Sequence, residues 1–247
     1  MKPADIDALP DFTEIDFDIE LPQFPISKVL PRLGDPPAEE NARPGQTDAI
    51  VIVAGLPRSG TSMLMQMVEA NGIPIATDDA RKADENNPKG YLEFERVKSL
   101  YKDNSWVGEL RGKCCKVVTP LLPFLPQNEN YQVIFIERNL NEVVSSQRKM
   151  LDRSDEAGAQ LSDEQLSQFL AAQNDAAQKI LSAKDIAVLR LSHAEVLSDP
   201  LDAARSIGHF LGVTDEQTIR IMSETVDSKL HRERGTVVAR SNVSVAE

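Results

Sequence analysis

The sequence predicts an α/β fold, a three-layer sandwich in which helices cover both faces of a central parallel sheet. Short apolar runs without polar alternation indicate strands that are buried on both faces. Helical patterns follow these runs along the chain, and such strand–helix alternation is typical of a parallel sheet. The chain has 247 residues, of which 41% are hydrophobic. That is enough for one sizeable domain of this kind.

The expected elements follow in order from these patterns. Strands are predicted at the apolar runs 49–54, 113–119, 133–136 and 186–191, with a short strand or extended segment at 73–76. Helices are predicted where apolar residues recur at helical spacing, at 60–71, 93–101, 140–152, 162–182, 200–211 and 215–226. The polar stretch 77–90 is expected to be largely loop, and the proline-bounded segment 120–126 is expected to be a turn.

The chain is predicted to begin with an acidic, proline-rich arm at residues 1–45. Residues 1–48 hold eleven Asp and Glu, four Lys and Arg, and eight prolines. This composition buries too little apolar area to offset the entropy of ordering, although six apolar residues within 12–24 would let the arm dock as an extended strand. We expect one domain at 46–235 and a tail at 236–247.

Composition and charge exclude several classes of function. The formal net charge of −12 disfavours nucleic acid or an anionic membrane surface as a partner. No apolar run approaches the roughly 18 residues of a membrane span, and the first residues lack a signal-peptide core. Cys114 and Cys115 are adjacent, which disfavours a disulfide, and no Cys/His cluster has metal-ligand spacing. We therefore expect a cytoplasmic protein without a metal.

The first predicted strand runs into a glycine-bracketed loop, G-L-P-R-S-G-T-S at residues 55–62. A helix follows, so the backbone N–H groups of 59–62 and the positive end of the helix dipole predict a P-loop-like anion site. Nucleotide triphosphatases carry a lysine at the position of Thr61. Here the positive charge lies at Arg58 instead, which favours an anion shorter than a triphosphate.

A second arginine follows a later strand in the segment R-N-L-N-E-V-V-S-S at residues 138–146. Arg138 ends the strand, and Ser146 lies eight positions later on the next predicted helix. Because the chain turns back after the strand, both side chains can flank one anionic group. An arginine at a strand end and a serine on a helix are each common. This pair therefore indicates an anion site only in combination with the glycine-bracketed loop at 55–62.

Together the two segments resemble the motifs of the sulfotransferase superfamily, whose members use 3′-phosphoadenosine 5′-phosphosulfate (PAPS). A third similarity lies at residues 189–200, followed by F-L-G at 210–212. The resemblance implies that the 5′-phosphosulfate is held by Arg58, Ser59, Gly60, Thr61 and Ser62. It implies that the 3′-phosphate is held by Arg138 and Ser146. It extends from about residue 50 to 230.

The catalytic base differs between branches of this superfamily. Cytosolic members place a histidine in K-T-H-L-P, and Pro120 stands in its place here. The tyrosyl-protein branch uses a carboxylate in G-E-E-T-R, and T-D-D-A-R occurs at the matching separation, residues 77–81. This similarity implies Asp79 as the base, and Asp78 and Glu93 are the alternatives. Glu93 could instead bind the acceptor.

The same branch has a lysine in C-N-K-D-P that contacts the phosphosulfate, and Lys116 in C-C-K is its counterpart. The implied reaction is in-line sulfuryl transfer to a hydroxyl acceptor, with Arg58 and Lys116 stabilising charge. A sugar, lipid, phenol, small metabolite or peptide tyrosine could be the acceptor. A non-catalytic nucleotide-binding or scaffold protein is the alternative, and a P-loop kinase is disfavoured by the absent lysine. His193 and His209 are expected to be structural.

Overall fold

The computed structural model describes residues 48–78, 90–154, 161–183 and 186–227, and the structural statements below concern these ranges. The predicted arm at 1–45 and the predicted tail at 236–247 lie outside the described residues. Asp79, the residue predicted to be the base, also lies outside them.

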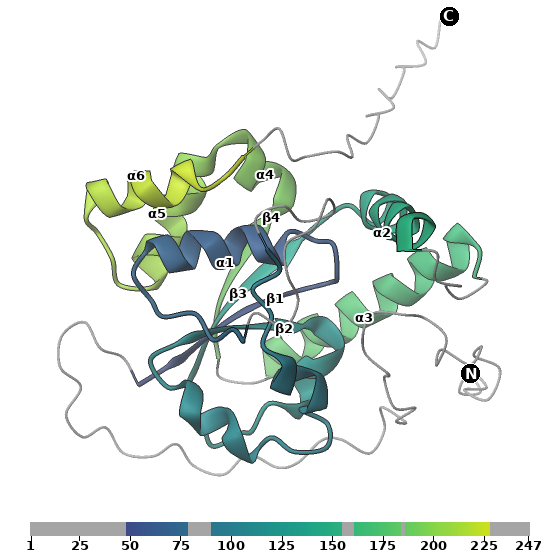
Figure 1. The fold of residues 1–247 in the computed structure, drawn as a ribbon, viewed down its shortest axis with the longest axis horizontal. Coiled ribbons are helices and arrows are strands. Elements are labelled where there is room, and N and C mark those ends of the chain that lie inside the picture. The colour runs from purple at the N-terminus through teal and green to yellow at the C-terminus, as the bar shows by residue number, and fades with distance from the viewer. Residues whose placement is uncertain (1–47, 79–89, 155–160, 184–185, 228–247) are drawn as a thin grey trace, which may run out of the picture.

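A sheet of four parallel strands forms the centre of the described structure (Figure 1). The strands are β1 (Ile50–Gly55), β2 (Cys114–Val118), β3 (Tyr131–Glu137) and β4 (Ala187–Ser192), in the order β2-β1-β3-β4. The predicted α/β class with a parallel sheet is confirmed. β1 and β3 occupy the middle, and every residue of β1 is buried. That burial explains why the strand is apolar without polar alternation.

Alternate residues of β1 pack into two separate cores, one on each face of the sheet. Ile50, Ile52 and Ala54 join the first core, and Val51 and Val53 join the second. The first face is covered by the 3₁₀ helices η4 (Glu95–Ser99), η5 (Ser105–Leu110) and η6 (Thr119–Phe124) and by α3 (Asp163–Ala183). The second face is covered by α1 (Thr61–Ala70), α4 (His193–Ser198), α5 (Pro200–Phe210) and α6 (Glu216–Glu224). The three predicted layers are therefore present.

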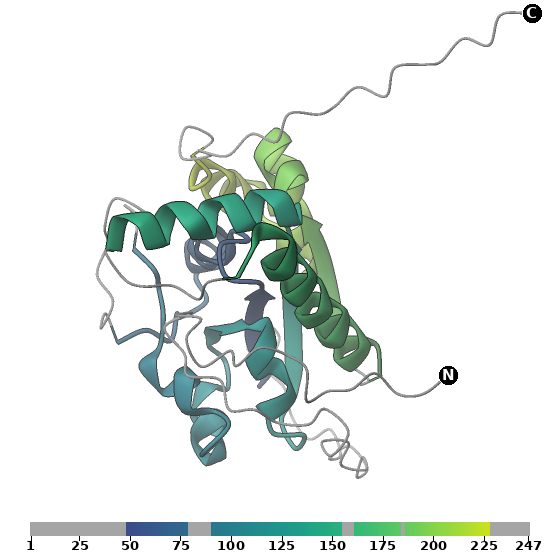
Figure 2. The ribbon, with the colours of Figure 1, turned by 90° about the vertical axis from the view of Figure 1, so that its right-hand side faces the viewer.

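The remaining helix, α2 (Leu140–Ser154), lies across the ends of the strands and beside α3 (Figure 2). A third apolar cluster joins it to its neighbours. In this cluster Leu56, the residue after β1, packs with Val143 and Val144 of α2 and with Leu166 and Leu170 of α3. The first turn of α2 is thereby fixed beside the loop that follows β1.

The structure differs from the predicted elements mainly on the first face. The helix predicted at 93–101 is a 3₁₀ helix of five residues, and η6 occupies most of the segment predicted to be a turn. The sequence analysis did not predict η5, although Trp106, Val107 and Leu110 of that helix are buried. Such short 3₁₀ helices lack the 3.6-residue period that identifies an α-helix. None of the helices in the described ranges is long and apolar enough to cross a membrane.

Candidate functional site

The loop between β1 and α1 contains two residues in the left-handed region and leads to a helix start without a side-chain cap. Arg58 and Gly60 both have positive φ, 67° and 105°. Gly60 is the N-cap of α1, no side chain caps this helix, and its first turn contains no acidic residue. The first N–H groups of a helix have no intrahelical acceptor, and the dipole makes this end positive. An anion would therefore be stabilised here.

The two loop glycines are required by close contacts. A Cβ on Gly55 would lie 2.5 Å from Ser59 Oγ and 2.8 Å from the backbone oxygen of Ile136. A Cβ on Gly60 would lie 2.7 Å from Cδ2 of His193, a buried residue at the start of α4. The sequence analysis expected His193 to be structural and did not connect it with the loop.

The backbone N–H and the hydroxyl of Ser59 differ in their hydrogen bonding. The N–H donates to the Leu56 backbone oxygen at 3.1 Å. The sequence had predicted instead that this N–H faces a bound anion. The hydroxyl is buried and has no hydrogen-bond partner among the described residues. A buried hydroxyl without a partner is costly and calls for an explanation. A bound ligand would provide the missing acceptor.

The two predicted anion motifs are joined by two hydrogen bonds. Arg58 Nε donates to Ser146 Oγ at 3.1 Å. Arg138 Nη1 donates to the backbone oxygen of Arg58 at 2.9 Å. The structure thus brings together the residues that the sequence analysis assigned to opposite ends of one ligand, and Arg138 supports the left-handed backbone of the loop. We call these three residues the arginine cluster.

Arg138 also forms an ion pair with Glu142, one turn further along the chain. Arg138 Nε lies 3.0 Å from Glu142 Oε2, and the two side chains are 9% and 18% exposed. The sequence analysis did not single out Glu142. Its spacing of four residues from Arg138 at the start of a helix is the signal that could have identified it.

A second group of polar residues surrounds Lys116 on β2. The buried Lys116 ammonium donates to the Tyr91 backbone oxygen, lies 3.1 Å from Glu93 Oε1, and lies 3.5 Å from Ser62 Oγ. Ser62 Oγ itself donates to the Tyr91 oxygen at 3.3 Å. We call Lys116, Glu93, Tyr91 and Ser62 the lysine cluster. Arg58 and Lys116 were both predicted to face the sulfuryl group. In the structure Arg58 contacts Ser146, whereas Lys116 contacts Tyr91 and Glu93.

The predicted carboxylates have different surroundings. Asp78 is exposed, and its Oδ2 accepts from the backbone N–H of Glu95 at 2.7 Å, which caps the first turn of η4. Glu93 is 23% exposed and paired with Lys116. Of the two described alternatives, Glu93 is the carboxylate that contacts another predicted site residue, Lys116.

Cys114 and Cys115 on β2 are free thiols inside the sheet. Burial raises the pKa of the Cys115 thiol to about 12, and it raises the pKa of the Cys114 thiol well above its ordinary value. Both side chains therefore remain protonated at neutral pH and are poor nucleophiles.

No protein-family model and no curated protein matches this sequence. Among solved structures, the chain is similar to the sulfotransferase domain from the curacin biosynthetic pathway. The TM-score is 0.50 at 11% identity, over 75% of this chain and 89% of that domain. A mouse sulfotransferase complexed with PAP gives 0.48 at 17% identity, over 78% and 69% of the two chains. A sulfotransferase from Alicyclobacillus acidocaldarius gives 0.42 at 16% identity, over 78% and 98%. The described part of the chain therefore shares the fold of the domain from the curacin pathway.

Proposed function

We propose that this protein is a sulfotransferase that moves a sulfuryl group from PAPS to a hydroxyl acceptor. The observation that carries the proposal is the direct hydrogen bonding between the two anion motifs, Arg58 to Ser146 and Arg138 to Arg58. In this proposal one motif holds the phosphosulfate and the other holds the 3′-phosphate. A donor that carries anionic groups at both ends would account for both arginines.

The residues of the loop fit such a donor. The start of α1 has neither a capping side chain nor an acidic residue in its first turn, and the buried Ser59 hydroxyl has no partner in the described part of the chain. We assign Arg58, Ser59, Gly60, Thr61 and Ser62 to the phosphosulfate. We assign Arg138 and Ser146 to the 3′-phosphate. When bound, the donor supplies the sulfuryl group and a phosphate leaving group.

The chain would contribute cations and a base to the transfer. The acceptor oxygen forms a bond to sulfur while the bond from sulfur to the phosphate oxygen breaks, and the hydroxyl proton passes to a carboxylate. Positioning and charge stabilisation dominate such a reaction. Lys116 is the proposed cation at the sulfuryl group, and Asp79 is the proposed base. Because Glu93 is ion-paired with Lys116, we assign it the role of orienting that lysine.

Donor binding provides the first test. We expect 3′-phosphoadenosine 5′-phosphate (PAP), the desulfated donor, to stabilise the protein by about 2.7 kcal/mol at a hundredfold excess over its Kd. Arg138→Ala should weaken PAP binding about 10- to 100-fold, because charge-assisted hydrogen bonds to the 3′-phosphate are lost. It should weaken the binding of adenosine 5′-monophosphate less, through the lost hydrogen bond to the Arg58 backbone alone. Thermal unfolding and titration calorimetry measure both effects.

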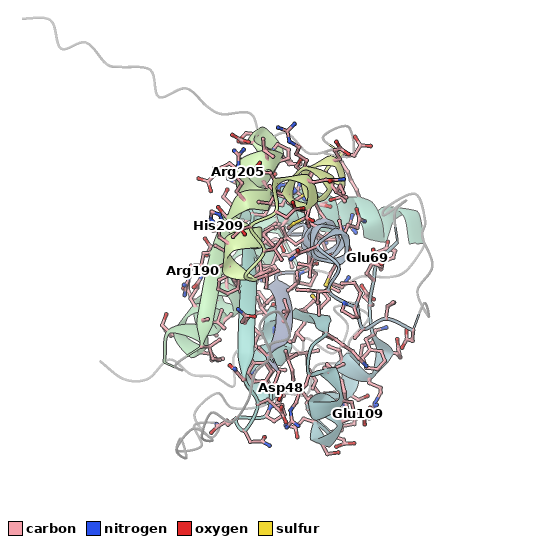
Figure 3. The ribbon with its side chains drawn as sticks, turned by 90° about the vertical axis from the view of Figure 1, so that its left-hand side faces the viewer. Asp48, Glu69, Glu109, Arg190, Arg205 and His209 are labelled. Carbon is pink, nitrogen blue, oxygen red and sulfur yellow. The ribbon has the colours of Figure 1, made fainter. Side chains whose placement is uncertain are left out.

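Arg205→Ala is the matched control for this test. Arg205 lies on α5, pairs with Glu216 and has a side chain that is 43% exposed (Figure 3). Its loss should leave both affinities unchanged. If PAP gives no thermal shift, or if Arg138→Ala binds PAP as the unmodified protein does, the proposed donor is wrong.

The identity of the base is tested by three amide substitutions. Asp79→Asn should lower kcat about 100- to 10,000-fold, which is the typical contribution of a general base, and should leave PAP affinity unchanged. Asp78→Asn should leave both stability and kcat nearly unchanged, because the asparagine oxygen can still accept from the backbone N–H of Glu95. Glu93→Gln should have a smaller kinetic effect than Asp79→Asn. The reverse order would assign the base to Glu93.

Two rival functions predict different results. A scaffold protein would bind PAP and transfer no labelled sulfate to hydroxyl-bearing small molecules, carbohydrates or peptides. A P-loop kinase would require ATP and Mg²⁺, and its phosphoryl transfer would be insensitive to PAP. Turnover of labelled PAPS in the absence of a divalent cation separates both rivals from the proposed reaction.

A further inference from the structure

We propose that Glu142 limits the affinity of the 3′-phosphate site by holding part of the charge of Arg138. This inference rests on the proposed function. It concerns how tightly the site binds the donor and, after transfer, the product that retains the same 3′-phosphate.

Most of the hydrogen-bonding capacity of the Arg138 guanidinium that faces the protein is already used. Two of its three guanidinium nitrogens are bound to groups of the protein, Nε to Glu142 Oε2 at 3.0 Å and Nη1 to the Arg58 oxygen at 2.9 Å. Nη2 has no hydrogen-bond partner among the residues that the structure describes. A phosphate at this site would therefore meet one side of an arginine whose other contacts are already made.

The negative charge of Glu142 lies close to the position that the phosphate would occupy beside Arg138. The Arg138 side chain is 9% exposed and that of Glu142 is 18% exposed, so water screens the pair only in part. A phosphate that contacts Arg138 also approaches the Glu142 carboxylate, and the repulsion between these anions opposes binding. An arginine compensated in this way distinguishes a 3′-phosphate from a 3′-hydroxyl and still releases the ligand. Release of product limits turnover in many enzymes.

A purely structural role for the ion pair predicts something else. A structural role would be to hold the Arg138 guanidinium in place beside the loop. In that case neutralising Glu142 would loosen Arg138 and weaken the binding of PAP. The two roles therefore predict opposite signs for one measurement.

The test compares the affinities of PAP and adenosine 5′-monophosphate, measured by titration calorimetry. Glu142→Gln keeps an oxygen that can accept from Arg138 and removes the negative charge. We expect this variant to bind PAP about tenfold more tightly and adenosine 5′-monophosphate within twofold of the unmodified protein. Glu142→Asp keeps the charge and should bind PAP within about twofold of the unmodified protein. If the glutamine variant fails to fold, Glu142→Ala also removes the negative charge and carries the same expectation.

Glu216→Gln removes another ion-paired carboxylate, that of the Arg205 pair, and controls for the change in net charge. It should change neither affinity. The inference is overturned if Glu142→Gln leaves PAP affinity unchanged or weakens it. It is also overturned if this variant binds PAP and adenosine 5′-monophosphate more tightly by the same factor. If the unmodified protein does not prefer PAP to adenosine 5′-monophosphate, the 3′-phosphate site itself is refuted. Preference for PAP without tightening in Glu142→Gln refutes only the role of Glu142.

Discussion

Replacing Lys116 with methionine is expected to lower kcat about 100- to 1,000-fold, the usual loss when one preorganised charge-stabilising group is removed. The Lys116 ammonium is held by the Tyr91 oxygen and Glu93 and lies 3.5 Å from Ser62 Oγ at the start of α1. Methionine matches the length of the stem and lacks the charge. Steady-state kinetics with labelled PAPS measures the effect, and titration with PAP measures donor affinity separately.

The same substitution should also affect stability. It removes one member of a buried ion pair, and we expect the free energy of unfolding to fall by about 1–3 kcal/mol. The loss is limited because the Glu93 carboxylate, which is 23% exposed, can be hydrated once Lys116 is absent. Lys98→Met is the matched control, since Lys98 pairs with Glu95 at a site where the side chains are 27% and 56% exposed. That variant should lose less than about 1 kcal/mol and keep its kcat. An unchanged kcat in Lys116→Met would remove Lys116 from the mechanism.

Gly60→Ala is expected to destabilise the protein by about 2–4 kcal/mol and to weaken PAP binding at least about a hundredfold. The added methyl group would lie 2.7 Å from His193 Cδ2 and 3.2 Å from Ile136 Cδ1, in a backbone conformation with φ of 105°. Overpacking costs about 1–3 kcal/mol and the positive φ adds about 1 kcal/mol. Relief of the contact and of the positive φ must move the loop or the His193 ring beside it, and small displacements of binding groups are costly to function.

Gly72→Ala separates the two causes. Gly72 follows the other end of α1 with φ of 88°, and a Cβ there would have no atom within 4 Å. This variant should lose only about 1 kcal/mol for the backbone and bind PAP normally. Urea unfolding and calorimetry on both variants give the comparison. Equal losses in the two variants would show that the contact between Gly60 and His193 does not matter.

The central strands could be predicted because strands that are buried on both faces consist of continuous apolar residues. Every residue of β1 is buried and residues 50–54 alternate between two cores, so a continuous apolar run was the expected pattern. The proximity of Arg138 to the first loop could also be predicted, since the carboxyl ends of parallel strands meet at one edge of the sheet.

The hydrogen-bond partners within the site could not be predicted in the same way. The motifs place Arg58 and Ser146 near one another, but the directions of their side chains depend on how α2 packs through Leu56 and Val143. The pairing of Lys116 with Glu93 joins residues 23 positions apart through a segment that has no regular period. Sequence separation alone gives no information about such a contact.

The position of Lys116 on a strand has a consequence for how the protein tolerates insertions. Lys116 lies opposite Val53 of β1 in the parallel pairing of β2 with β1. The neighbours of its side chain therefore depend on the register of these two strands. A slip of one residue would turn its side chain to the opposite face of the sheet and bring Cys115 or Val117 into its place. A single-residue insertion that shifted this register would therefore place the Lys116 ammonium against the apolar first core and remove it from Ser62 and Glu93. Length changes in this segment should be under tighter constraint than its composition.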